Sequence, residues 1–270
     1  MTLLHVHGLS YSADGRQLMI PGHHGLAIYS EGRWSKAEGP AHDYMGFAAT
    51  RDAIYSSGHP APNSGLNNPF GLIKSRDGGR SWQKLGLEGE SDFHMLAASH
   101  GTNAVYVFNP RPNSRMRQGG IHYTLDDGRS WQRADARGLP ARIQGLAVHP
   151  TDAKLVATAE GPYLSRDAAR SFERLAGGKQ ALAVSFDLDG EQLWFSSYVG
   201  QAQLWRIALK AGAQAQPVKL PALGEDAVAN LAQHTGRPDE IAIATFKRSV
   251  YLSPDQGGRW TQIAKEEATR

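Results

Sequence analysis

The side chains best suited to chemistry are the histidines near the start of the chain. The chain has eleven histidines, and eight of them fall within the first hundred residues. These eight are His5, His7, His23, His24, His42, His59, His94 and His100. Imidazole nitrogens accompanied by carboxylates and a thioether suit zinc, copper, nickel or iron better than calcium or magnesium. This region therefore predicts a transition-metal site.

The spacing of the first two histidines favours chelation. His5 and His7 are separated by one residue, and alternate residues of a β-strand face the same side. We predict that His7, His59 and His94 form the core of one metal site, with zinc or copper as the ion. The residues expected to complete or orient this site are His5, His23, His42, Met45 and Asp92. A pocket for a small polar ligand and ordinary structural hydrogen bonding are the alternative interpretations of these histidines.

A repeated turn indicates the elements that position the histidines. Residues 75–82 read S-R-D-G-G-R-S-W, and the pattern S/T-x-D-x-G-x-x-W returns at 124–131 and 253–260. An imperfect copy that lacks the glycine and has Phe in place of Trp lies at 165–172, and a shorter copy lies at 30–34. In such a turn the Asp carboxylate accepts hydrogen bonds from the turn's own N–H groups, a glycine takes a positive φ, and the aromatic residue packs underneath. The aspartates expected to have this structural role are Asp77, Asp126, Asp167 and Asp255.

The length of the repeat predicts the architecture. The aromatic residue that closes each copy stands at 34, 82, 131, 172 and 260, so the steps are 48, 49, 41 and 88 residues, the last being two steps of 44. Units of roughly 40–50 residues with four short strands are typical of β-propeller blades. We therefore predict an all-β, six-bladed β-propeller that forms a single domain over 1–270. The predicted blades cover 5–39, 42–88, 92–139, 141–177, 179–220 and 227–265.

These turns resemble the Asp-box (BNR) repeats of sialidase-like and sortilin-like β-propellers. The motifs HVHGL at 5–9, HDYMGF at 42–47, SGHP at 57–60 and DFH at 92–94 also resemble a bacterial family of BNR-repeat proteins labelled as glycosyl hydrolases. The resemblance implies a propeller fold over nearly the whole chain. It also implies, as an expectation, the hydrolysis of glycosidic bonds.

The topology of a propeller is expected to gather the histidines at one mouth of the central channel. The first strand of each blade lines the channel and starts at the face where the second strand ends. Two long loops, 59–70 and 109–118, follow the expected second strands of the second and third blades and share the pattern P-x-P-N-S. Loops of this length are more often functional than neutral, so we predict that they form lids over the histidines. The lid residues are Asn63, Asn109, Arg111 and Asn113.

Two other classes of function stay open at this point. A glycoside hydrolase needs two carboxyl groups about 5 Å or 6.5–9.5 Å apart, and the candidates are Asp43, Asp92 and Glu90. If the protein is an enzyme, a metal-dependent hydrolase is the alternative to a glycoside hydrolase. The arginine cluster and the tyrosine–glutamate pair of a sialidase are not visible. A scaffold for protein partners, as in sortilin-like or photosystem-assembly propellers, is the remaining interpretation.

Composition argues against several classes of protein. The net charge of +3 is small and the basic residues are scattered, so we expect no nucleic-acid partner. No apolar run reaches the ~18 residues that a membrane-spanning helix needs. The chain has no cysteines, which excludes disulfides and thiolate ligands. No signal peptide is visible, which favours the cytoplasm unless a leader has been removed.

Overall fold

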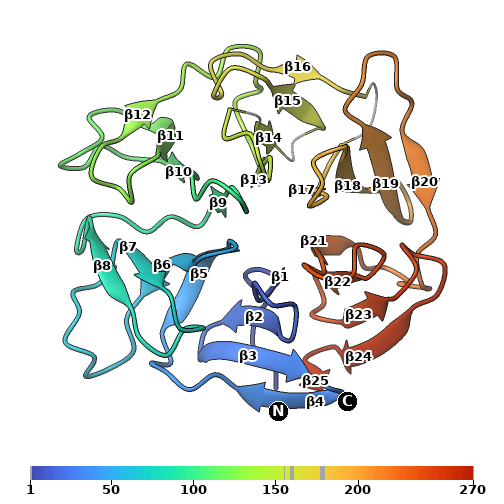
Figure 1. Ribbon diagram of the computed structural model, residues 1–270, viewed down its shortest axis with the longest axis horizontal. Coiled ribbons are helices and arrows are strands. Elements are labelled where there is room, and N and C mark those ends of the chain that lie inside the picture. Colours follow the sequence, from blue (N-terminus) through green and yellow to red (C-terminus); the bar gives the residue numbers. More distant parts are fainter. Residues whose placement is uncertain (1, 155, 159–160, 177–179, 270) are drawn as a thin grey trace.

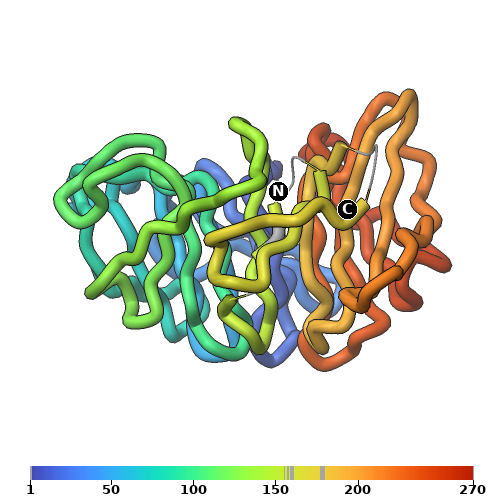
Figure 2. Tube along the Cα trace, turned by 90° about the horizontal axis from the view of Figure 1, so that it is seen from above, coloured from blue at the N-terminus to red at the C-terminus, as the bar shows by residue number. Residues whose placement is uncertain are grey.

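The chain folds as an all-β propeller. The computed structural model describes residues 2–154, 156–158, 161–176 and 180–269, and none of these lies in a helix. Antiparallel sheets stand around a central channel (Figure 1), and loops project from both faces of the ring (Figure 2). No helix within the described ranges is long and apolar enough to cross a bilayer. The predicted all-β class and the propeller arrangement are confirmed.

Three sheets contain the strands of the N-terminal half. One consists of β1 (Ser10–Tyr11), β2 (Leu18–Gly22), β3 (Gly25–Ser30) and β4 (Arg33–Lys36). The next consists of β5 (Asp43–Ala49), β6 (Ile54–His59), β7 (Leu72–Ser75) and β8 (Gln83–Gly86). The third consists of β9 (Leu96–Ala98), β10 (Val105–Asn109), β11 (Gly120–Thr124) and β12 (Gln132–Arg133).

The remaining sheets contain the strands of the C-terminal half. The first of them consists of β13 (Leu146–Val148), β14 (Val156–Thr158), β15 (Tyr163–Ser165) and β16 (Glu173–Arg174). It is followed by β17 (Ala183–Phe186), β18 (Gln192–Tyr198), β19 (Ala202–Ala208) and β20 (Gln216–Val218). The last sheet consists of β21 (Val228–Gln233), β22 (Ile241–Thr245), β23 (Val250–Ser253), β24 (Thr261–Lys265) and β25 (Ala268–Thr269).

Hydrogen bonding closes the ring at the chain ends. The strands form five four-stranded sheets and one five-stranded sheet, and neighbours in each sheet are consecutive along the chain. The fifth strand, β25, pairs with β24. Thr2 forms an isolated bridge to Ala268, and the Leu3 N–H donates to the Glu267 carbonyl at 2.8 Å. The two ends of the chain therefore lie side by side at the outer edge of the ring (Figure 1), where they join the first sheet to the last.

Apolar clusters between neighbouring sheets hold the channel wall in place. Tyr55 and Leu72 of the second sheet pack in one buried cluster with Val105 and Val107 of the third and with Phe93, which precedes the third sheet. Full burial of a large apolar side chain contributes about 1.5–3 kcal/mol relative to exposure. The strands next to the histidines are therefore supported by apolar packing between neighbouring sheets.

The four repeated turns share one hydrogen-bond pattern. After β7, Asp77 Oδ1 accepts from the Ser75 hydroxyl at 2.8 Å and from the Ser81 N–H at 2.9 Å. The same pattern is present in the turns of Asp126, Asp167 and Asp255. Hydrogen bonds from the Ser81 hydroxyl and N–H, followed by the Ser75 hydroxyl, lower the pKa of Asp77 to about 2. These carboxylates therefore accept hydrogen bonds within their own turns.

We expect the repeated turns to make stability depend on pH below 4. The pKa of each of the four aspartates falls from 3.8 to about 2 on folding. Because the unfolded chain binds these protons at higher pH, the stability that the turns contribute is present above pH ~3.8 and is lost as the pH falls through ~2. Urea unfolding between pH 5 and pH 2 should show a falling midpoint, and Asp77→Asn should reduce the slope. A midpoint that stays constant over this range would contradict the assignment.

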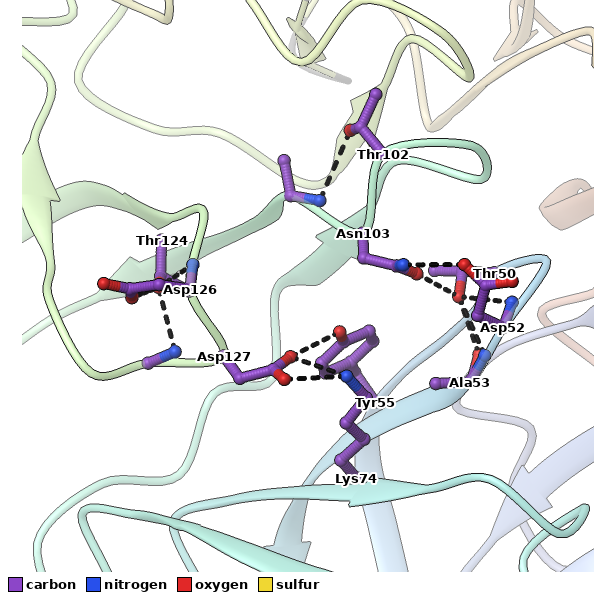
Figure 3. A network of polar contacts seen from close by, with 12 residues as sticks. Thr50, Asp52, Ala53, Tyr55, Lys74, Thr102, Asn103, Thr124, Asp126 and Asp127 are labelled. Carbon is purple, nitrogen blue, oxygen red and sulfur yellow. Dashed lines mark hydrogen bonds and ion pairs between the residues drawn. The ribbon is translucent and has the colours of Figure 1, made fainter.

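A buried lysine joins the second and third sheets. Lys74 in β7 has 4% of its side chain exposed, and its Nζ lies 2.7 and 2.8 Å from the two carboxylate oxygens of Asp127. The Tyr55 hydroxyl donates to the same carboxylate at 2.6 Å (Figure 3). Beside this group, the Thr50 hydroxyl donates to Asn103 Oδ1 at 2.6 Å. Because Asp127 belongs to the repeated turn after β11, the network fixes one blade against the next.

Candidate metal centre at the channel mouth

The ends of several strands meet at one mouth of the channel. β5 begins with Asp43 and β6 ends with His59, and these two residues are direct partners across the strand pair. His23 lies in the turn between β2 and β3. His7 and His94 lie just before β1 and β9, the first strands of their sheets. The fold therefore brings together histidines that are far apart in the sequence.

A cavity of about 680 Å³ opens at this mouth. One part of its wall contains the amide side chains of Gln144 and Asn230 and the guanidinium of Arg248. The other part contains His5, His7, Met45 and His94. The cavity therefore offers nitrogen ligands, together with polar groups that can orient a bound molecule.

The first cluster consists of His7, His23 and Asp43. His7 Nε2 lies 3.4 Å from Asp43 Oδ1, and His23 Nδ1 lies 2.6 Å from Asp43 Oδ2. The side chains of His7 and Asp43 are 14% and 19% exposed. The ring of His5 lies beside them, with its centroid 4.1 Å from that of His23. Three imidazoles and one carboxylate therefore meet in a partly buried space.

The surroundings of His7 favour its neutral form. Burial is the main cause and lowers the pKa of His7 below 6.5, against the opposing charge of Asp43. The imidazoles of His23, His5 and His94 lower this pKa further. A neutral imidazole has a nitrogen lone pair with which to bind a metal ion. Among the described residues, His7 Nε2 and Asp43 Oδ1 are buried and have no hydrogen-bond partner.

The second cluster consists of His59, Asp92 and His94. Asp92 Oδ2 lies 3.1 Å from His59 Nε2 and 2.7 Å from His94 Nε2. The Asp92 side chain is 18% exposed, whereas those of His59 and His94 are 41% and 58% exposed. His59 Nδ1 lies 2.7 Å from Asn68 Oδ1, which belongs to the loop between β6 and β7. The second cluster is therefore more open to solvent than the first.

The three histidines expected to form one core are divided between the two clusters. His7 belongs to the first cluster, whereas His59 and His94 belong to the second. The physical reason is that Asp43 and Asp92 stand near the starts of adjacent inner strands, and each binds the imidazoles within its reach. The clusters adjoin nonetheless, because Asp43 and His59 are partners across β5 and β6.

His42 belongs to the protein core, which corrects the expectation that it completes or orients the metal site. Its side chain is buried, and its Nδ1 accepts the Ala61 N–H at 2.9 Å. Its ring packs against those of Tyr44 and Phe70. Because His42 precedes Asp43 directly, its side chain points to the opposite side of the strand. His42 therefore anchors the loop that contains Ala61.

The three carboxylates proposed for hydrolysis have different partners. Glu90 accepts hydrogen bonds from the Ser114 N–H at 2.7 Å and from its hydroxyl at 2.9 Å, and so fastens the loop between β10 and β11. Asp43 and Asp92 instead face imidazoles. Asp43 and Asp92 are therefore partners of histidines. Glu90 is not placed beside them as a general acid.

The expected lid residues stabilise their own loops beside the mouth. Asn109 Nδ2 donates to the Arg111 carbonyl at 2.6 Å, and Asn113 Nδ2 donates to the Ser91 hydroxyl at 2.8 Å. Asn63 adopts a positive φ of 61°, as turn residues often do. These contacts give the two loops defined shapes, and Asn113 ties one of them to the chain just before Asp92.

Two residues of the site were not indicated by the sequence analysis. Asn68 orients His59, and the only signal for it was its place in a long polar loop. Arg248 lines the cavity, with a left-handed backbone φ of 65° that is uncommon for a residue other than glycine. Within the described part of the chain, its buried Nε has no hydrogen-bond partner. No repeated motif includes Arg248, so no pattern pointed to it.

Comparison with known proteins identifies the fold. No protein-family model matches the chain, and no curated protein is similar to it at a significant level. Among solved structures, the GH74 enzyme of Niastella koreensis has a TM-score of 0.64 at 13% sequence identity, over 97% of this chain. The GH74 xyloglucanase from Xanthomonas campestris has a TM-score of 0.57 at 17% identity, also over 97% of this chain.

The chain spans 45% of the length of each of the two GH74 enzymes. A structure of YCF48 bound to a D1 peptide has a TM-score of 0.57 at 16% identity, over 97% of this chain and 81% of the other. At these identities the similarity concerns the fold alone. The shared fold is the β-propeller.

Proposed function

We propose that the protein binds a transition-metal ion, zinc or copper, at one mouth of the propeller channel through His7, His23 and Asp43. The main support is the buried pair of His7 Nε2 and Asp43 Oδ1, which face each other at 3.4 Å without hydrogen-bond partners in the described part of the chain. A buried polar atom left unpaired costs about 1–3 kcal/mol. A cation between the two atoms satisfies both at once.

The separation of these two atoms fits a tetrahedral ion. Zinc binds imidazole nitrogen at about 2.0–2.1 Å and carboxylate oxygen at about 2.0–2.2 Å. Two ligands at about 2.0–2.1 Å from a tetrahedral centre are roughly 3.3–3.4 Å apart. The 3.4 Å between His7 Nε2 and Asp43 Oδ1 matches this spacing. His23, whose Nδ1 lies 2.6 Å from Asp43 Oδ2, either supplies a third ligand or orients the carboxylate.

The number of protein ligands determines the chemistry open to the ion. Three ligands leave a fourth position for water, as in catalytic zinc sites, whereas four ligands close the shell, as in structural sites. His5 is a further imidazole close to this cluster, with its ring centroid 4.1 Å from that of His23. Whether the fourth ligand is a protein side chain or a water molecule therefore decides between a metal-handling protein and a metal-dependent hydrolase.

The proposal places this site on a six-bladed ring of the Asp-box (BNR) type. Each sheet, including the five-stranded one, is counted as one blade. The hydrogen-bond pattern shared by the repeated turns supports the Asp-box assignment. The sialidase-like resemblance makes glycoside hydrolysis the second candidate, and the YCF48 structure, which contains a peptide, makes protein binding the third. We favour metal binding because the mouth carboxylates Asp43 and Asp92 face imidazoles.

Calorimetric titration of zinc and copper into protein without a histidine tag tests the proposal. His7→Gln and Asp43→Asn should each weaken zinc binding by at least the roughly 10–100-fold that loss of an outer-shell partner costs. Asp135→Asn removes an exposed carboxylate with the same change in charge, and this control should bind as the wild type does. Equal affinity in the wild type and both site variants would contradict the proposal, as would no binding at all.

A further inference from the structure

We infer that the same mouth binds a second transition-metal ion, held by His59, Asp92 and His94. This inference rests on the proposed function, because it adds a second ion beside the first. Three observations support it: the hydrogen bonding of His59, the state of the Asp92 carboxylate, and the placement of the two clusters on neighbouring strands.

The hydrogen bonding of His59 leaves a lone pair directed at a carboxylate. His59 Nδ1 lies 2.7 Å from Asn68 Oδ1, and an amide oxygen can only accept, so this nitrogen carries the proton. In the neutral ring, Nε2 is then the unprotonated nitrogen. It lies 3.1 Å from Asp92 Oδ2, which is also an acceptor. Two acceptors at this distance repel each other unless a cation or an additional proton lies between them.

The Asp92 carboxylate can accept more hydrogen bonds than the described residues donate to it. Without an ion, His94 Nε2, at 2.7 Å from Asp92 Oδ2, can donate one hydrogen bond, and the same nitrogen binds a metal only after it gives up that proton. Asp92 Oδ1 is buried and has no hydrogen-bond partner among the described residues. The 3.1 Å between His59 Nε2 and Asp92 Oδ2 is close to the roughly 3.3–3.4 Å expected for two ligands of one tetrahedral ion. An ion shared by His59 Nε2 and Asp92 Oδ2 therefore fits the spacing of these two atoms.

The two clusters are close enough to act as one centre. Asp43 of the first cluster and His59 of the second are opposite each other in the β5–β6 pair. Side chains at directly opposite positions of antiparallel strands share one face, with Cβ atoms about 4.5–5.5 Å apart. His7 and His94 also line the same cavity. Two ions placed in this way can hold one oxyanion or one water molecule between them.

The two sites should differ in affinity because their exposure differs. In the first cluster, the side chains of His7 and His23 are 14% and 34% exposed. In the second, those of His59 and His94 are 41% and 58% exposed. More exposed side chains are more mobile and better solvated, so ordering them around an ion costs more. We expect the first equivalent of metal to bind tightly and the second more weakly.

The number of zinc ions bound per chain, measured by equilibrium dialysis and elemental analysis, tests the inference. The wild type should bind two equivalents in two steps. Asp92→Asn should retain the tight equivalent and lose the weak one, and Asp43→Asn should show the reverse. The Asp43→Asn/Asp92→Asn double variant should bind neither, while Asp135→Asn should bind both. Circular dichroism of each variant establishes that the propeller is folded.

Asn68→Ala provides a test that removes no ligand. Asn68 is a positioning residue, because it acts on the metal through the ring of His59. Losing it should weaken the second equivalent by roughly 10–100-fold, the usual effect of removing an outer-shell partner, and leave the first unchanged. Asn67→Ala, at the neighbouring loop position, is the matched control and should change neither equivalent. An Asn68→Ala protein with an unchanged second step would overturn the role given to His59.

The outcomes separate this inference from the function on which it rests. The wild type could bind one equivalent of zinc that is lost in Asp43→Asn and kept in Asp92→Asn. This result overturns the second ion and leaves the proposed metal site standing. One equivalent that is lost in either variant indicates a single shared site and also overturns the second ion. No equivalent in the wild type overturns the proposed function itself.

Discussion

Replacing Asp127 by alanine is expected to lower the free energy of unfolding by about 3–5 kcal/mol, the usual cost of leaving a buried charge without its partner. Lys74 is 4% exposed, and Asp127 contacts its Nζ through both carboxylate oxygens, at 2.7 and 2.8 Å. The Tyr55 hydroxyl, which donates to Asp127 at 2.6 Å, loses its acceptor in the same variant. Urea unfolding at neutral pH, followed by circular dichroism, measures the loss.

Two control variants show whether the buried charge is the cause. Lys74→Met combined with Asp127→Leu removes both charges, and replacing a buried ion pair with apolar residues is often neutral or stabilising. The double variant should therefore be more stable than Asp127→Ala. Glu38→Ala breaks an ion pair with Arg80 whose side chains are 85% and 67% exposed, and it should cost only about 0–1 kcal/mol. Equal losses in Asp127→Ala and Glu38→Ala would contradict the argument.

The parts of the fold that local chemistry determines could be predicted from the sequence. The turn at 75–82 needs only a hydroxyl, a carboxylate and a glycine at fixed positions, and its hydrogen bonds form among residues at most four apart. The contact between Lys74 and Asp127 joins residues 53 positions apart. It depends on how two blades pack together, and no spacing in the sequence encodes that packing. Propeller class was therefore predictable, whereas the link between blades was not.

The candidate site shows the same division between local and long-range information. Alternation along strands predicts that His7 and Asp43 face the channel. The same alternation places the side chain of His42 on the other side of the strand, next to Tyr44 and Phe70. The position of His42 outside the metal cluster therefore follows from its place one residue before Asp43. The separation of His7 from His59 depends instead on side-chain distances of a few ångströms. Such distances are set by the curvature of the ring and not by the order of residues.

Zinc at a hundredfold excess over its dissociation constant is expected to raise the free energy of unfolding of the wild type by about 2.7 kcal/mol. The reason is linkage, since an ion that binds only the folded state stabilises that state. His7, His23 and Asp43 come from three separate segments, so the unfolded chain does not hold them together. Urea unfolding with and without zinc measures the gain, and magnesium at the same concentration is the control because it prefers oxygen ligands.

Asp43→Asn tests whether this gain in stability comes from the metal site and not from histidines elsewhere in the chain. If the substitution weakens binding 10–100-fold, the same zinc concentration should stabilise the variant by only about 0.4–1.4 kcal/mol. Binding to histidines of the unfolded chain has the opposite effect, because it reduces the gain in every protein that contains them. Asp43→Asn keeps all eleven histidines, so unfolded-state binding predicts the same response in both proteins. A smaller gain in Asp43→Asn than in the wild type can therefore come only from the folded mouth of the channel.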